Sequence, residues 1–70
     1  MIIEGSQIRV VHSAELAELK LNGLLGEMGI VIETLMECER KNKGYMVLFP
    51  DTFRNEYVWF IPQLSAYEKD

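Results

Sequence analysis

The sequence predicts an all-β domain, a small five-stranded barrel, and two stretches carry this prediction. Residues 44–50 and 57–62 are dense in the β-branched and aromatic side chains that favour strands, and each stretch ends at a proline, which cannot donate to a sheet ladder. The polar connector between them, residues 51–56, has the size of a hairpin connection. We therefore expect two adjacent strands, over which the rest of the chain closes.

The length and composition fit a single domain spanning residues 1–70. A chain of 70 residues buries only about 60% of the surface that its unfolded form exposes, so every apolar strand is needed for the core. Hydrophobic residues make up 49% of the chain, which supplies one core and excludes the disordered class. The single cysteine, Cys38, cannot form an internal disulfide, and its acidic neighbours favour an incidental thiol over a redox role.

The expected location is the cytoplasm, by elimination. The first four residues, Met-Ile-Ile-Glu, have neither the basic region nor the apolar core of a secretory signal. No apolar run approaches the roughly 18 residues of a membrane span, so no membrane association is expected.

The charge balance disfavours nucleic acid as a general partner. Eleven acidic and seven basic residues give a formal net charge of −4. Nucleic-acid binders usually have the opposite sign, because neutralisation of phosphates supplies most of their non-specific affinity.

Residues 7–12 are predicted to form the first strand, because Ile8 and Val10 alternate with polar residues at period two. His12 would lie at the end of this strand. A lone histidine there is expected to cap or to form a hydrogen bond, since a metal site needs several convergent ligands.

Residues 13–21 allow two interpretations. Ser13 is a suitable N-cap, an acid follows in the first turn and a lysine in the last, which together favour a helix of two turns. The alternative is an irregular loop that uses Leu16, Leu19 and Leu21 as a flap over one mouth of the barrel. In both cases this long connection covers a hydrophobic opening.

Residues 26–35 are predicted to form the second strand. Gly26 and Gly29 indicate a tight turn followed by a position where another backbone comes close. Residues 30–32 are all apolar, so we expect this part of the strand to be buried on both faces, as in a bent strand shared by two layers.

The connection at residues 36–44 is polar and carries turn signals, and it contains the only basic cluster, Arg40, Lys41 and Lys43. This cluster is either a solvated hairpin tip that discourages edge pairing or a contact for an acidic partner. The strands at residues 45–49 and 57–61 follow. A tight turn at residues 62–64 then leads into a short final strand at residues 65–67.

All seven aromatic residues fall within residues 45–67, which directs attention to one surface. Alternation would bury one set of side chains on the two strands: Val47, Phe49, Val58 and Phe60. The remaining apolar side chains would point outward: Met46, Leu48, Tyr57, Trp59 and Ile61. Exposed apolar area usually indicates a partner, so Tyr45, Tyr57 and Trp59 are candidate partner contacts. The alternative is that residues 14–25 cover this area.

The order of these pieces resembles the small Src-homology-3-like barrels, and within them the electron-transport accessory type, of which the peripheral stromal subunit of photosystem I is a member. The likeness is carried by residues 5–10, 29–31 and 47–49 and by Leu64. It implies a non-catalytic accessory domain that docks onto a larger complex and binds no cofactor. Arg9 matches a basic position in the first strand of that type.

Two further likenesses are narrower. Residues 26–31 resemble the KOW motif of ribosomal and transcription-factor barrels, which implies nucleic-acid or ribonucleoprotein binding, here through the basic hairpin and Arg54. The pair Ile61-Pro62 together with Tyr67 is similar to the closing segment of barrels that bind proline-rich peptides.

The sequence predicts an interaction module with no enzymatic activity. One histidine, one cysteine and scattered acids do not supply a catalytic triad, dyad or metal set. The predicted function is a protein-interaction or accessory module that docks through an aromatic face. Nucleic-acid binding through the basic hairpin is the alternative, and a plain structural subunit is a third.

Overall fold

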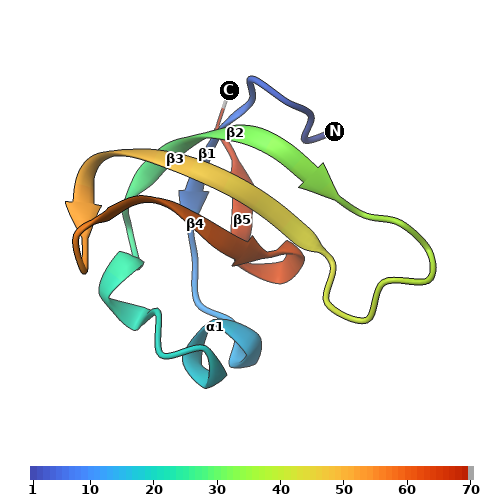
Figure 1. The fold of residues 1–70 in the computed structure, drawn as a ribbon, viewed down its shortest axis with the longest axis horizontal. Helices are drawn as coiled ribbons and strands as arrows, with labels where there is room; N and C mark the ends of the chain where they lie inside the picture. The colour runs from blue at the N-terminus through green and yellow to red at the C-terminus, as the bar shows by residue number, and fades with distance from the viewer. Residues whose placement is uncertain (70) are drawn as a thin grey trace.

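The computed structural model describes residues 1–69, which form five antiparallel strands in one sheet with little helix (Figure 1). The strands are β1 (Gln7–Val10), β2 (Met28–Leu35), β3 (Gly44–Phe53), β4 (Glu56–Pro62) and β5 (Ala66–Glu68). The helical pieces are α1 (Ala14–Glu18) and two 3-10 turns, η1 (Asn22–Leu24) and η2 (Gln63–Ser65). The predicted all-β class and the number of strands are confirmed.

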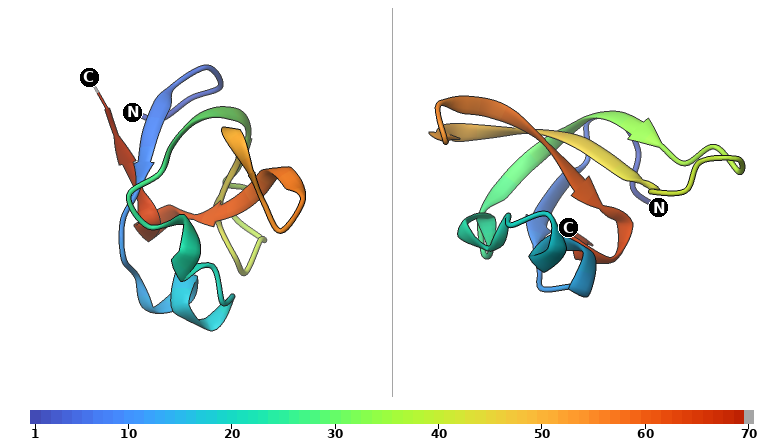
Figure 2. Two further views of the ribbon diagram at one scale, coloured as in Figure 1. Left: turned by 90° about the vertical axis from the view of Figure 1, so that its left-hand side faces the viewer. Right: turned by 60° about the horizontal axis from the view of Figure 1, so that its bottom comes forward.

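The sheet has the strand order β4-β3-β2-β1-β5 and bends into two layers. Figures 1 and 2 show β3 and β4 in one layer and β1 and β5 in the other. Strand β2 belongs to both layers, because its residues 28–30 pair with β1 and its residues 30–35 pair with β3. Within residues 1–69, β4 and β5 are the sheet edges and do not pair with each other, so the sheet is not closed. We call the side of β2–β4 that faces the core the inner face, and the opposite side the outer face.

Strand β1 follows the predicted alternation. Ile8 and Val10 are fully buried, and the residues between and before them are exposed. The strand ends at Val10, two residues earlier than predicted, and the N–H of Val11 donates instead to the Ser65 carbonyl, 2.8 Å away. His12 is exposed just beyond the strand.

Residues 13–25 combine the two predicted alternatives, a short helix followed by a covering loop. The Ser13 hydroxyl accepts a hydrogen bond from the Leu16 N–H and so caps α1. The helix ends before Lys20, which adopts a left-handed φ of 60°. Three leucines of this segment are buried: Leu16, Leu21 and Leu24. The expectation that Leu19 also covers the core is wrong, because Leu19 is 47% exposed.

The two glycines that precede and open β2 have the predicted roles. Gly26 adopts a φ of +83°, in the region that favours glycine, and it forms the turn into the strand. Gly29 lies where β3 comes close. A Cβ at this position would be 2.6 Å from Val47 Cγ1 and 2.8 Å from the Leu48 carbonyl oxygen. Both predictions are confirmed.

The prediction that residues 30–32 are buried on both faces is wrong. Val31 is 1% exposed, whereas Ile30 and Ile32 are 41% and 45% exposed. Ile30 pairs with Leu48 on the outer face, and Ile32 is the extra residue of a β-bulge between Val31 and Glu33. The two layers of the sheet pack only through their inner faces, so a strand that belongs to both layers is still covered on one side.

Strand β3 runs beyond its predicted end at Phe49, passes through Pro50 and reaches Phe53. Pro50 lies where the pairing of β3 with β4 is irregular, between the Leu48↔Val58 and Phe53↔Glu56 pairs. Its missing N–H therefore interrupts no regular ladder. By contrast, β4 does end at its proline, Pro62.

The hairpin between β3 and β4 is confirmed, but its loop is shorter than the predicted connector. Arg54 and Asn55 alone form the loop, with φ values of 52° and 68°. Two consecutive left-handed residues are the mark of a type I′ turn, whose twist matches that of the strands it joins. Asn55 suits this conformation because asparagine tolerates left-handed φ values.

The predicted orientation of β4 is wrong, because its two faces are exchanged. Val47 pairs with Trp59 and Tyr45 pairs with Ile61, so Trp59 and Ile61 lie on the inner face. The cause is the irregular stretch of β3, where residues 49–52 stand opposite the single residue Tyr57. Strand β3 therefore has three extra residues in this stretch. Because side chains alternate with a period of two, an odd number of extra residues exchanges the inward and outward positions of β4 relative to those of β3.

The chain closes as predicted with the turn η2 and the short strand β5. Ser65 of η2 is fully buried, and its hydroxyl lies 2.5 Å from the Ser13 hydroxyl, which joins this turn to the start of α1. The core that these elements enclose consists of Ile8, Val10, Leu16, Leu21, Leu24, Val31, Tyr45, Val47, Phe49 and Ile61.

Candidate functional site

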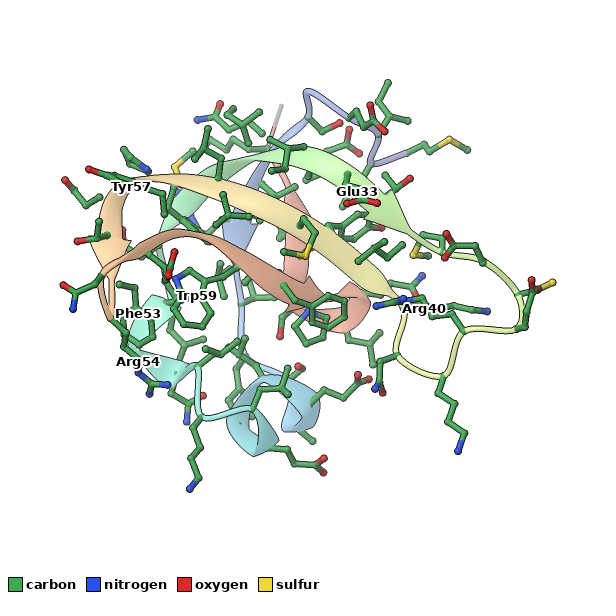
Figure 3. The ribbon with its side chains drawn as sticks, viewed as in Figure 1. Glu33, Arg40, Phe53, Arg54, Tyr57 and Trp59 are labelled. Carbon is green, nitrogen blue, oxygen red and sulfur yellow. The ribbon has the colours of Figure 1, made fainter. Side chains whose placement is uncertain are left out.

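The three predicted partner contacts do not share an exposed face. Tyr45 is only 6% exposed and belongs to the core, although it also lines an open hollow of about 930 Å³ beside residues 1–4. Trp59 is half-buried and packs against the core. Tyr57 is the one of the three that is well exposed, at 53%. Figure 3 places Tyr57 and Trp59 apart, with Trp59 beneath the sheet layer.

Trp59 is held in place by the hairpin to which it belongs. Its indole Nε1–H lies 3.2 Å from the Phe53 carbonyl oxygen and 3.1 Å from that of Glu56, so it donates to the chain on both sides of the turn. Its ring meets the edge of the Phe53 ring with the centroids 5.6 Å apart and the planes at 69°. The polar tip of this side chain is therefore satisfied within the molecule.

The segment of residues 14–25 covers these aromatic rings. The Arg54 guanidinium lies 4.7 Å from the centroid of the Phe53 ring, and its Nη2 donates to the Lys20 carbonyl at 2.7 Å. Gly23 packs so closely on the Phe53 ring that a Cβ there would overlap it. Residues 14–25 thus cover the Phe53 ring of the hairpin (Figure 3), but they do not cover the whole of the predicted apolar area, since Leu48 and Tyr57 stay 43% and 53% exposed.

A contiguous apolar surface lies instead on the outer face of β2–β4, whereas other exposed apolar side chains, such as Ile3 and Leu64, lie elsewhere on the molecule. Cross-strand pairing places Ile30, Leu48 and Val58 in one row across three strands. Met46 and Phe60 form the next row along the strands. Ile30 and Leu48 are 41% and 43% exposed, and the other three are partly exposed. Adjacent rows of this kind make one continuous apolar surface, since opposed side chains on a sheet face lie in contact.

Charged residues border this outer face. Glu33 of β2 pairs with Met46 and so stands at the β2 end of the second row. The Arg40 guanidinium, from the loop between β2 and β3, lies 5.8 Å from the centroid of the Phe60 ring at the β4 end. Arg40 also borders a small hollow of about 260 Å³ that it shares with residues of α1.

The basic hairpin does not form one cationic surface. Lys41 is exposed, Lys43 is half-buried, and the Arg40 Nε donates to the Asn42 carbonyl at 2.7 Å. The same loop contains acidic side chains. The Cys38 thiol donates to the Glu39 carboxylate and, together with a backbone hydrogen bond, lowers the pKa of that carboxyl. A negative charge is therefore kept beside the three basic residues.

Part of the outer face is predictable from the sequence. The prediction that Met46 and Leu48 point outward is confirmed. Val58 and Phe60 were missed, because five consecutive apolar residues on β4 give no indication of phase. The exposure of Ile30 and Ile32 is not predicted, because a run of consecutive apolar residues is typical of a buried strand. One signal in the sequence bears on the orientation of β4. Pro50 lies inside β3, and a proline inside a strand marks a bulge, which changes the face that the paired strand turns outward.

Neither a metal set nor a related protein defines the site further. No group of three or more potential metal ligands occurs within residues 1–69. None of the helices described in that range is long and apolar enough to cross a membrane.

Comparison of the chain with protein-family models, curated proteins and solved structures finds no match. The candidate site is therefore defined by the geometry of this chain alone.

Proposed function

We propose that this chain is a non-catalytic protein-interaction module that docks through the outer face of β2–β4. The supporting observation is the pair of apolar rows on that face, in which Ile30 and Leu48 remain more than two-fifths exposed. Small soluble domains rarely leave a contiguous apolar surface uncovered unless another molecule covers it. Glu33 and Arg40 give this surface the polar border that is typical of protein interfaces.

The finer architecture belongs to the same proposal: a Src-homology-3-like barrel of the accessory type. Its support is the strand order β4-β3-β2-β1-β5, the long connection between β1 and β2, and the 3-10 turn before β5. Such a barrel is filled by its own side chains, which directs binding to its surface. The exposed free thiol of Cys38 favours a reducing compartment such as the cytoplasm.

The proposed docking surface differs from the aromatic face that the sequence suggested. Tyr45 and Trp59 are used by the core and by the hairpin, so neither is assigned to the interface. The basic hairpin is not proposed as a nucleic-acid site, because Glu37 and Glu39 lie in the same loop as its lysines. The proposed contact residues are instead Ile30, Ile32, Met46, Leu48, Val58 and Phe60.

Size fractionation of an extract from the source cell tests this proposal. We expect the chain to elute well above its own 8.1 kDa, and Leu48→Glu to move it to the position of the free chain. The physical reason is that a carboxylate in an apolar interface loses its hydration without gaining a partner. Leu48 is exposed, so the substitution should change the free energy of unfolding by no more than about 0.5 kcal/mol.

The matched control is Leu25→Glu. Leu25 is 40% exposed, close to the 43% of Leu48, but it follows η1 on the segment that covers the inner face. We expect this variant to elute with the unmodified chain. Elution of the unmodified chain as a free 8.1 kDa species, or an equal shift for both variants, would contradict the proposal.

A further inference from the structure

We infer that the surface which covers the outer face is the outer face of a second copy of this chain, in a two-fold symmetric dimer. This inference rests on the proposed function, since it names the partner of the same surface. It is carried by the charges at the two ends of one cross-strand row.

That row runs across three strands and ends in opposite charges. Glu33 on β2 is opposite Met46 on β3, which is opposite Phe60 on β4. The Arg40 guanidinium lies over the Phe60 ring. Neighbouring strands are about 4.8 Å apart, so the acid and the base are separated by roughly two strand spacings, with apolar side chains between them. Figure 3 shows Glu33 and Arg40 at different sides of β3.

Neither charge has an ion-pair partner within residues 1–69. The one ion pair found within residues 1–69 joins the N-terminal ammonium to Glu68, 3.1 Å apart. Arg40 shares its small hollow with Glu15 and Glu18, but neither carboxylate lies within ion-pair distance of it. In the described part of the chain, the Arg40 guanidinium has one hydrogen bond, from Nε to the Asn42 carbonyl, and its terminal nitrogens are the groups that would meet a carboxylate.

A two-fold rotation makes this row complementary to itself. When two outer faces meet about an axis parallel to β3, the rotation reverses the direction of the row. Glu33 of one chain then faces Arg40 of the partner subunit, and the second ion pair follows by symmetry. The same rotation sets the apolar rows against each other, with Leu48 facing its own counterpart. An isologous interface requires this kind of self-complementarity.

The size of the molecule limits such an interface. Along its two longer axes, the plane of Figure 1, the molecule extends 30 × 26 Å. A standard protein interface buries about 800 Å² on each partner, so the inferred dimer lies at or below that size, where association is weak and depends on concentration. Two sheets that pack face to face bury their facing side chains in a layer about 10 Å thick, which is the arrangement inferred here.

Sedimentation equilibrium of the purified full chain over a concentration series tests the inference, with three charge variants. We expect the unmodified chain to dimerise, and Glu33→Arg and Arg40→Glu each to raise the dimer dissociation constant about tenfold or more, because each creates two like-charge contacts. An equimolar mixture of the two variants should regain the unmodified affinity, since both pairs of the mixed dimer are then of opposite charge. The double variant with both substitutions should regain it as well.

The other outcomes separate this inference from the proposed function. A chain that stays monomeric at every concentration overturns the dimer, and so does a dimer that Leu48→Glu or the charge variants leave unchanged. If extract fractionation still shows the Leu48→Glu shift in either case, the outer face binds a different protein and the proposed function stands. Circular dichroism of each variant confirms that the fold is intact before its association is compared.

Discussion

Gly44→Ala is expected to destabilise the protein by about 3 kcal/mol, the upper end of the usual cost of overpacking a core. A Cβ at this position would overlap the Ile61 carbonyl oxygen and would lie 2.8 Å from the Phe60 ring. The carbonyl belongs to a strand paired with β3, so it cannot move without separating the two strands. For a domain of 70 residues this loss is a large share of the total stability.

Urea unfolding of Gly44→Ala and Gly26→Ala, followed by circular dichroism, measures the difference. Gly26 has a positive φ but open space around its Cα, so alanine there introduces backbone strain of about 1 kcal/mol and no overlap. We expect a clearly larger loss for Gly44→Ala. Equal losses for the two variants would mean that β3 and β4 do not pair closely at Gly44.

Trp59→Ala is expected to lower the free energy of unfolding by about 3 kcal/mol, as is usual for the loss of a packed aromatic side chain. The substitution removes the edge contact with Phe53 and leaves the Phe53 and Glu56 carbonyls without their indole donor. Tyr57→Ala, at a position that is 53% exposed, should change stability by less than about 0.5 kcal/mol.

Thermal unfolding monitored by circular dichroism compares the two variants, and the fluorescence of Trp59 in the unmodified chain gives an independent check. We expect an emission maximum between those of buried and free indole, because Trp59 is half-buried. If Trp59→Ala leaves the thermal stability unchanged, the Trp59 side chain lies on a free surface, as alternation in the sequence predicts. If the predicted loss of stability is observed, failure of the Trp59→Ala variant to bind a partner would be explained by its weakened fold. It would not show that Trp59 contacts the partner.

The sequence predicts the elements of this fold better than it predicts their faces. The strand around Ile8 follows from period-two alternation, and those around Val31 and Val47 follow from apolar, β-branched runs. Gly26 and Gly29 predict the turn and the close approach at the start of β2. These features are local, since the residue type alone fixes what the backbone does there. The cap of α1 by Ser13 is of the same kind.

The candidate surface could be predicted only in part, because it depends on register between strands. Three extra residues in β3 decide that Phe60 points outward and Trp59 inward, and no periodicity within β4 contains that information. The bulge at Ile32 likewise exposes a side chain that its apolar neighbours suggest is buried. The two charges at the ends of the row, Glu33 and Arg40, also lie on separate elements. The sequence does not predict that Arg40 lies over Phe60, because Arg40 belongs to the loop between β2 and β3 and Phe60 to β4.

The most direct test of the central claim, that the outer face of β2–β4 is the docking surface, is site-specific photo-crosslinking in the source cell. A photoreactive residue in place of Leu48 reports on the outer face, and one in place of Leu25 reports on the segment that covers the inner face. We expect one discrete adduct from position 48, with the mass of two chains if the partner is a second copy, and none from position 25. Absence of an adduct from position 48, or the same adducts from both positions, would contradict the account.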